Sequence, residues 1–230
     1  MVFRLNRCEV WLAALLFFIG PVSLAAQAQS QIVADGGVSD QSSKVANATL
    51  VEAPPILDGD VLNDPVWAQA VPVSGFLQSA PDEGQPATER TEVRVVFTRD
   101  TIFFGVVCYD QDPSSIIVSD SRRDSSMNDA DSFQMILDTF RDQQNGFVFG
   151  TNPAGIEYDG QVSNEGQGGG RGRGRQQTGS GSGFNKNWDA SWIVRTHINE
   201  VGWMAEFEIP LRSLRYGNKP QTWGLNIQRN

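Results

Sequence analysis

The hairpin "TEVRVVFTRDTIFFGVVCYD", residues Thr91–Asp110, decides the class of fold. In its first half, three apolar side chains alternate with a glutamate and an arginine. This period of two is typical of a strand with one buried face. The second half, Thr101–Asp110, is apolar on both faces, as in a central strand that is covered on both sides. Only two residues separate the halves, so the sequence predicts a tight antiparallel hairpin.

Other short runs with the same period follow along the chain, and turn residues separate them. Together with the hairpin they give about eight predicted strands, while helical patterns are limited to single turns. This pattern predicts an all-β fold, a two-sheet antiparallel β-sandwich of the jelly-roll or immunoglobulin-like kind. The further runs are Asp131–Asp138, Asn145–Gly155, Ile156–Ser163, Trp188–Ile198, Gly202–Pro210 and Thr222–Arg229.

The stretch "ILDGDVLNDPVWAQA", Ile56–Ala70, combines turn residues with a tryptophan. Asp58 and the glycine after it are typical of a turn. Asp64 can cap a short helical turn that begins at a proline, where the missing N–H costs nothing. We expect Trp67 to plug the open end of the sandwich, because a tryptophan buries on the order of 200 Å². A contact between Trp67 and a ligand is the alternative.

Residues 1–28 are predicted to be a secretory signal peptide, cleaved after Ala28. Arg4 and Arg7 precede the apolar run Val10–Gly20, and small residues follow it. A membrane anchor is the alternative, but the run is shorter than the roughly 20 residues that span a bilayer. The sequence therefore predicts an exported protein of the periplasm, the outer-membrane surface or the extracellular space. Residues 29–48 are predicted to be a disordered leader and residues 49–230 the sandwich.

Residues 164–185 form a Gly/Arg-rich segment with two interpretations. It is either a flexible insertion between strands or an RGG-type nucleic-acid-binding segment. The net charge of −9 becomes −10 without the signal peptide, because two arginines and one glutamate leave with it. An acidic chain repels phosphate backbones, so the flexible insertion is favoured and nucleic acid is not an expected partner.

Few residues offer catalytic or metal chemistry. Cys108 is the only cysteine after the signal peptide, and it lies in an apolar run. The sequence therefore predicts a buried thiol and no internal disulfide. His197 is the only histidine, so no Ser/His/Asp triad can form without it. Asp129 and Asp131 are interpreted first as turn formers, with a structural calcium site or a catalytic pair as alternatives. No other cofactor is expected.

Five motifs follow one another between residues 54 and 230: "PPILDGDVLNDPVWAQA", "TEVRVVFTRDTIFFGVVCYD", "DADSFQMILD", "GWMAEFEIPLRSLR" and "TWGLNIQRN". In this order they resemble family 9 carbohydrate-binding modules. The resemblance implies a sandwich that binds a polysaccharide or oligosaccharide, is itself non-catalytic and serves carbohydrate catabolism beside a glycoside hydrolase. The stretch 141–160 resembles a subgroup of large bacterial proteins in which an outer-membrane β-barrel follows the module.

The resemblance also implies a carbohydrate site, with departures from the family pattern. Asn128 stands where the first of two sugar-clamping tryptophans is expected, and the second would fall beyond the last residue. Gln134 and Asn152 stand where a sugar-binding glutamate and asparagine are expected. Gly150 replaces an arginine, so one charged donor is missing. Trp188 is either an aromatic platform for a sugar or a core residue.

Three functions remain open from the sequence. The first is carbohydrate binding through Gln134, Asn152, Asn128 and Trp188. The second is a structural periplasmic or surface domain of an outer-membrane barrel protein that binds no sugar, which the missing tryptophan and arginine favour. The third is a hydrolase, for which the sequence fixes no acid/base pair. The resemblance further implies another strand, and a barrel or a catalytic domain, after Asn230.

Overall fold

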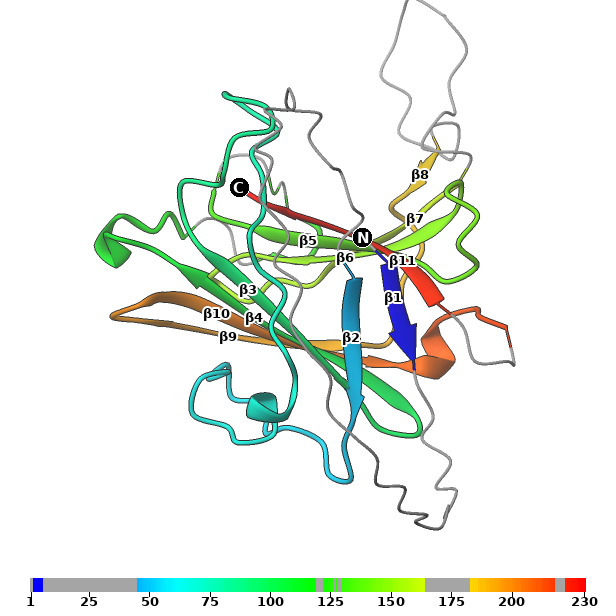
Figure 1. The fold of residues 1–230 in the computed structure, drawn as a ribbon. Helices are drawn as coiled ribbons and strands as arrows, with labels where there is room; N and C mark the ends of the chain where they lie inside the picture. Colours follow the sequence, from blue (N-terminus) through cyan, green and yellow to red (C-terminus); the bar gives the residue numbers. More distant parts are fainter. Residues whose placement is uncertain are drawn as a thin grey trace, which may run out of the picture.

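The chain folds into a β-sandwich (Figure 1). The computed structural model describes residues 2–5, 45–118, 122–125, 127, 130–163, 183–217 and 222–230. In these residues there is no α-helix, and three short 3-10 turns accompany the strands. The predicted all-β fold with two mostly antiparallel sheets is therefore confirmed. No helix in the described part of the chain is long and apolar enough to cross a membrane.

The first layer, sheet A, has the strand order β8-β7-β6-β5-β11, with every neighbouring pair antiparallel. The second layer, sheet B, has the order β3-β4-β10-β9 and is also antiparallel. The strands of sheet A are β5 (Phe133–Asp138), β6 (Gly146–Thr151), β7 (Tyr158–Val162), β8 (Phe184–Asn185) and β11 (Thr222–Arg229). Those of sheet B are β3 (Thr91–Phe97), β4 (Thr101–Tyr109), β9 (Ile193–Asn199) and β10 (Gly202–Pro210).

Two further strands form a seam between the layers. The strand β1 (Val2–Leu5) pairs antiparallel with β11 and parallel with β2 (Val45–Leu50). In turn, β2 pairs parallel with the last two residues of β3. The β1 strand lies inside the predicted signal peptide. Since β2 begins at Val45, the predicted start of the domain at Thr49 is too late.

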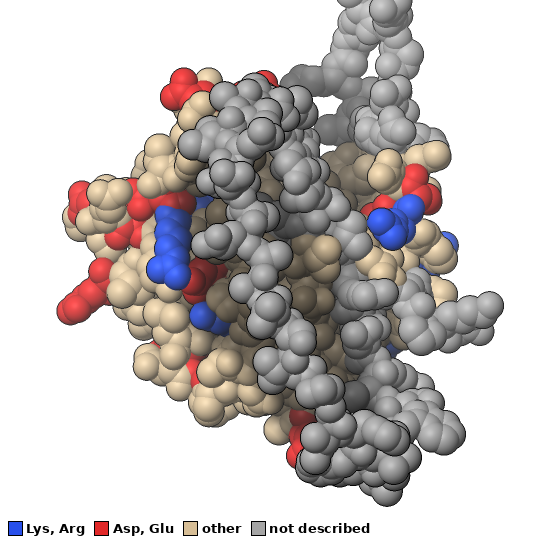
Figure 2. Space-filling model, viewed as in Figure 1, with Lys and Arg blue, Asp and Glu red and all other residues tan. Residues whose placement is uncertain are grey.

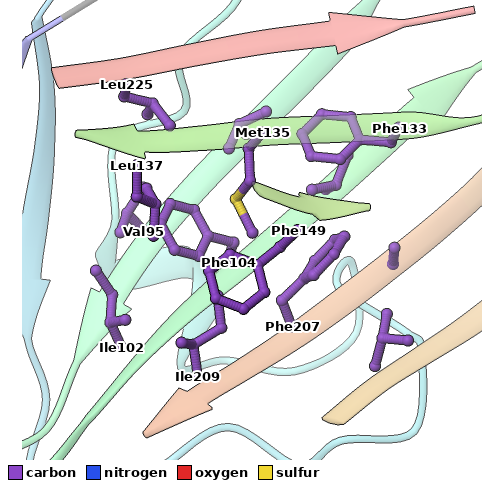
Figure 3. Packing of buried hydrophobic residues seen from close by; sticks show 14 of the residues in the cluster. Val95, Ile102, Phe104, Phe133, Met135, Leu137, Phe149, Phe207, Ile209 and Leu225 are labelled. Atoms are coloured by element: carbon purple, nitrogen blue, oxygen red, sulfur yellow. The ribbon is translucent and has the colours of Figure 1, made fainter. Parts of the chain in front are cut away.

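The inward faces of the two sheets meet in one hydrophobic core (Figure 3). Phe133, Met135 and Leu137 of β5 point inward with period two. From sheet B, Phe207 approaches Phe133 with a ring-centroid distance of 5.8 Å. Cys108 lies in the same core and is fully buried, as the sequence predicts.

A second, smaller core covers the outer face of sheet B and is built from the stretch around Trp67. The Trp67 ring occupies the space above Gly105 of β4, where a methyl group would lie 2.8 Å from it. The buried carboxylate of Glu206, on β10, accepts hydrogen bonds from the Trp67 indole N–H (2.6 Å) and from the backbone N–H groups of Asp58 (2.9 Å) and Gly59 (2.7 Å). The prediction that Trp67 is structural is confirmed, but it covers a sheet face rather than the open end of the sandwich.

The turn at Gly59 explains why the sequence needs glycine there. Its φ angle is +90°, and a methyl group would lie 2.7 Å from the carbonyl carbon of Thr196 on β9. Any other residue is therefore disfavoured by both conformation and space. Asp64 supports the same stretch, because its carboxylate accepts hydrogen bonds from Val66 N and Ile56 N, both 2.8 Å long.

The last two residues of the predicted insertion 164–185 form the strand β8. The Phe184–Asn185 strand pairs with Val162 and Gln161, so the last residues of that segment belong to sheet A. The remainder, residues 164–182, lies outside the described residues, as do Asn128 and Asp129.

Candidate functional site

The outer face of sheet A carries a row of four outward-facing residues, one on each of four neighbouring strands. The register aligns Gln228 with Gln134, Gln134 with Gly150, and Gly150 with Tyr158. Phe133 and Met135 flank Gln134 and lie in the core, so Gln134 faces outward, and the residues paired with it in register lie on the same face. We call them the outer row. At about 4.8 Å between strands, the row is about 14 Å long.

The amide end of the outer row is polar and accessible. Gln228 and its neighbour on the same face, Asn226, are exposed, while Gln134 is half-buried. The Gln228 Nε2 donates to Asn230 Oδ1 at 2.9 Å. Each amide offers both a donor and an acceptor, as does a hydroxyl group, so this end can pair with hydroxyl groups in either direction.

The centre of the outer row is apolar, because its residue there is a glycine, Gly150. A methyl group on Gly150 would lie 2.9 Å from Gln134 Cγ and 3.2 Å from Met127 Cε. Met127 is buried, with only 4% of its surface exposed, and it fills the space beside Gly150. An arginine at position 150 would therefore displace Met127.

The other end of the outer row is aromatic. Tyr158 and Phe184 stack with 6.2 Å between ring centroids and 19° between ring planes. Phe184 lies over Gly160, and the Lys186 ammonium lies 5.4 Å from the Tyr158 ring centroid. Burial, followed by the charge of Asp124, raises the pKa of Tyr158, so its hydroxyl is neutral and can donate. The sequence interpretation missed this pair, and the only signal for it was an aromatic residue at the end of a low-complexity segment.

Two of the other predicted carbohydrate ligands, Asn152 and Trp188, are held by contacts within the fold. Asn152 is 1% exposed, and its Oδ1 accepts from Ala154 N at 2.9 Å, so its visible role is to shape a turn. Trp188 packs on the inward-facing Phe147 and Phe149 at ring distances of 4.9 and 5.9 Å. The structure therefore favours the core alternative for Trp188. Asn128 lies outside the described residues.

No protein-family model matches the chain, and no curated protein is similar to it. A solved structure titled as a carbohydrate binding module family 9 from Caldicellulosiruptor kristjanssonii in complex with glucose has a TM-score of 0.50 and 14% identity, covering 80% of this chain and 76% of that chain. A second structure of such a module from the same organism, in complex with cellotriose, has a TM-score of 0.47 at 14% identity, with 80% and 75% covered.

The fold is similar to that of a family 9 carbohydrate-binding module. At 14% identity, the likeness to that module extends to the fold alone. The roles of individual side chains must therefore come from the geometry of this chain.

An ion-pair cluster beside the aromatic end holds the neighbouring loop. The guanidinium of Arg123 contacts Glu157 and Asp159 at 2.7 Å each and Asp189 at 2.5 Å. Burial alone lowers the pKa of Arg123, but Asp159 and Asp189 raise it above its ordinary value. Asp159 also accepts from Ala190 N at 2.7 Å. One arginine thus pairs with three carboxylates and links the elements that carry them.

A cleft of about 840 Å³ lies beside the amide end of the outer row. One wall is the second half of β11, and the other is the loop that contains Phe76–Pro81. Asp131 also lines the cleft, and its Oδ2 accepts from Ile117 N at 2.8 Å. This bond joins two segments that are 14 residues apart in the sequence, so it does not make Asp131 a turn former. In the described part of the chain no group of three His, Cys, Asp or Glu side chains is arranged to hold a metal ion.

Proposed function

We propose that the chain binds a saccharide on the outer face of sheet A, through the outer row. The observation that supports this most is the alignment of two glutamines, a glycine and a stacked tyrosine across four strands. The fold adds support, because the similar solved module is in complex with glucose. The row offers amides for hydroxyl groups at one end and aromatic rings for the apolar face of a sugar at the other.

The proposed binding is weak and directional. Gln134 and Gln228 bond hydroxyl groups without a charged partner, and each such bond contributes about 0.5–1.5 kcal/mol. The Tyr158–Phe184 pair supplies the flat apolar surface. At the centre, Met127 covers the buried Gly150, so we propose that a saccharide contacts the amide end or the aromatic end on either side of it.

We also propose a setting for this binding. The arginines and apolar run of residues 1–28 support export. The acidic composition supports a neutral saccharide over a nucleic acid partner, and Figure 2 shows acidic side chains at several places on the face that it draws. The chain then acts as a non-catalytic binding module of a larger exported protein in carbohydrate breakdown.

The experiment is a calorimetric titration with glucose and cello-oligosaccharides. We expect binding that weakens about two- to tenfold in Gln134→Ala and in Gln228→Ala, since a tenfold loss equals about 1.4 kcal/mol. Gln69→Ala is the matched control, because Gln69 is an exposed amide in the stretch that covers sheet B. Equal affinity in all three variants would reject the outer row as the site.

The second candidate function is a structural domain without sugar binding. Two residues support this second function. Gly150 leaves the row without a charged donor, and the buried Met127 fills the space beside Gly150. The absence of binding to every saccharide tested, from a folded protein, would favour this function over the first.

A further inference from the structure

The seam between the sheets is closed at one end and open at the other. At the closed end, β1 and β2 lie between Thr222–Gly224 of β11 and Val96–Phe97 of β3. At the open end, Val73 forms a bridge to Val93 of β3, and the cleft separates the following loop from the second half of β11. An edge of sheet A therefore borders the cleft.

The backbone of β11 presents hydrogen-bonding groups to this cleft. Asn230 and Ser132 exchange both backbone hydrogen bonds, at 3.0 and 3.3 Å. In an antiparallel ladder such pairs alternate with pairs whose N–H and C=O groups face away from each other. The register therefore turns these groups of Ile227 and Arg229 away from β5, and both residues line the cleft. Within the described residues, neither forms a backbone hydrogen bond on that side.

We propose that the cleft binds an extended basic peptide, which adds to sheet A as a strand antiparallel to β11. The same edge already accepts a strand in this way, because β1 pairs antiparallel with Thr222–Gly224. A strand beside Leu225–Asn230 would continue that line for about six residues, or about 20 Å. The outward N–H and C=O groups of Ile227 and Arg229, two residues apart, match the spacing of a peptide backbone.

The charges of the cleft select a basic occupant. Glu89, Asp110 and Asp131 line it, against one cation, Arg229. The Arg229 guanidinium is already engaged, since it donates to Arg90 O at 3.1 Å and lies 3.9 Å from Asp110 Oδ2. Lysine or arginine side chains of a peptide would therefore meet an excess of carboxylates.

The walls of the cleft supply apolar contact for the alternate side chains of the strand. Phe76 and Ile227 are partly buried against the main core, and Leu77 is 59% exposed. A strand places every second side chain on one face, so apolar residues between the basic ones would pack on these walls.

The test uses the full chain and a blocked seven-residue peptide of alternating lysine and valine. Binding is measured by fluorescence anisotropy, and the bound edge is located by amide hydrogen exchange. We expect slower exchange at Ile227 and Arg229. We also expect about tenfold weaker binding for the same peptide with glutamate in place of lysine. Methylation of alternate peptide nitrogens keeps the charge and removes the strand's donors, and it is expected to abolish binding.

Three outcomes would overturn this proposal. The methylated peptide binds as well as its parent, the protected amides lie on an outer edge strand, β8 or β9, or a cello-oligosaccharide protects Ile227 and Arg229 in place of the peptide. The last outcome would assign the cleft to a saccharide. A loss of saccharide binding in Gln134→Ala would leave the peptide result unaffected, so the two proposals fail separately.

Discussion

The buried carboxylate of Glu206 leads to the first prediction. Burial raises its pKa above the ordinary value of 4.5, although the Trp67 hydrogen bond opposes this shift. Since the folded-state pKa is the higher one, the folded protein holds the proton more tightly. The contribution of Glu206 to stability is thus complete below pH 4.5 and is lost as the pH rises through the raised pKa.

We expect Glu206→Gln to lower the free energy of unfolding by about 1–3 kcal/mol near pH 5, because the amide N–H₂ would face backbone or indole donors. The difference from the unchanged protein should narrow toward pH 8, where the unchanged protein carries the buried charge. Urea denaturation at both pH values measures this difference in the free energy of unfolding. Glu208→Gln is the control, on the same strand but half-buried. A difference that widens with pH would contradict the argument.

Cys108 leads to the second prediction. Burial raises the pKa of its thiol to about 12, and the side chain is fully buried. Because the thiolate is the reactive form, iodoacetamide should leave Cys108 unmodified in the folded protein and modify it after denaturation. Peptide mass mapping distinguishes it from Cys8. Rapid labelling of Cys108 in the folded protein would show that the core opens easily.

Single residues were predictable from the sequence where the local pattern decides their place. Cys108 sits in an apolar strand, and Trp67 follows a capped turn, so both were predicted to be structural. Asn152 was assigned by resemblance, and its burial depends on a turn that the resemblance does not specify. Tyr158 was missed because its importance comes from its stacking on Phe184. The two rings meet because β7 pairs with β8, and these strands are far apart in the sequence.

At the scale of elements, β8 leads to the third prediction. This strand has two residues, and its ladder to β7 is short. Phe184 holds it by stacking on Tyr158 over Gly160, where a methyl group would lie 2.5 Å from Phe184 Cζ. We expect Gly160→Val to displace Phe184 and detach β8 while the core stays folded. Limited proteolysis with chymotrypsin should then cut after Phe184 more rapidly.

Phe184→Ala provides the comparison for this test, because it removes the ring without crowding Gly160. Both variants should keep a cooperative unfolding transition close to that of the unchanged protein. If Gly160→Val unfolds the whole chain while Phe184→Ala does not, β7 rather than β8 carries the effect.

The elements with a clear period were predicted closely, and the others were not. The predicted run 202–210 matches β10, and 222–229 matches β11. The run 188–198 was predicted as one strand, but the ladder begins at Ile193. Trp188 and Trp192 alternate because they pack into the core, which does not require strand pairing. β1 and β8 have four and two residues, too few to show a period.

At the scale of the whole molecule, the class of fold was predictable and the site was only partly so. The sandwich follows from alternation, which each strand shows alone. The outer row follows from register, which joins β11 to β5 across a long stretch of chain and aligns β6 with β7 across a short one. Gln134 was identified by resemblance, but its neighbours Gln228 and Tyr158 are set by pairings that local patterns do not specify.

The seam leads to the last prediction, which concerns the N-terminus. Cleavage after Ala28 would remove β1 and leave unpaired edges on both β11 and β2. We expect protein recovered from the exported fraction to begin at Gln29, by N-terminal sequencing. Compared with the uncleaved chain, it should show faster amide exchange at Trp223, which is paired with Phe3 in the uncleaved chain. It should also show a lower free energy of unfolding, because the seam loses one of its two strands. Recovery of the exported chain with Met1 intact and protected amides in Val2–Leu5 would instead make β1 a permanent part of the sandwich.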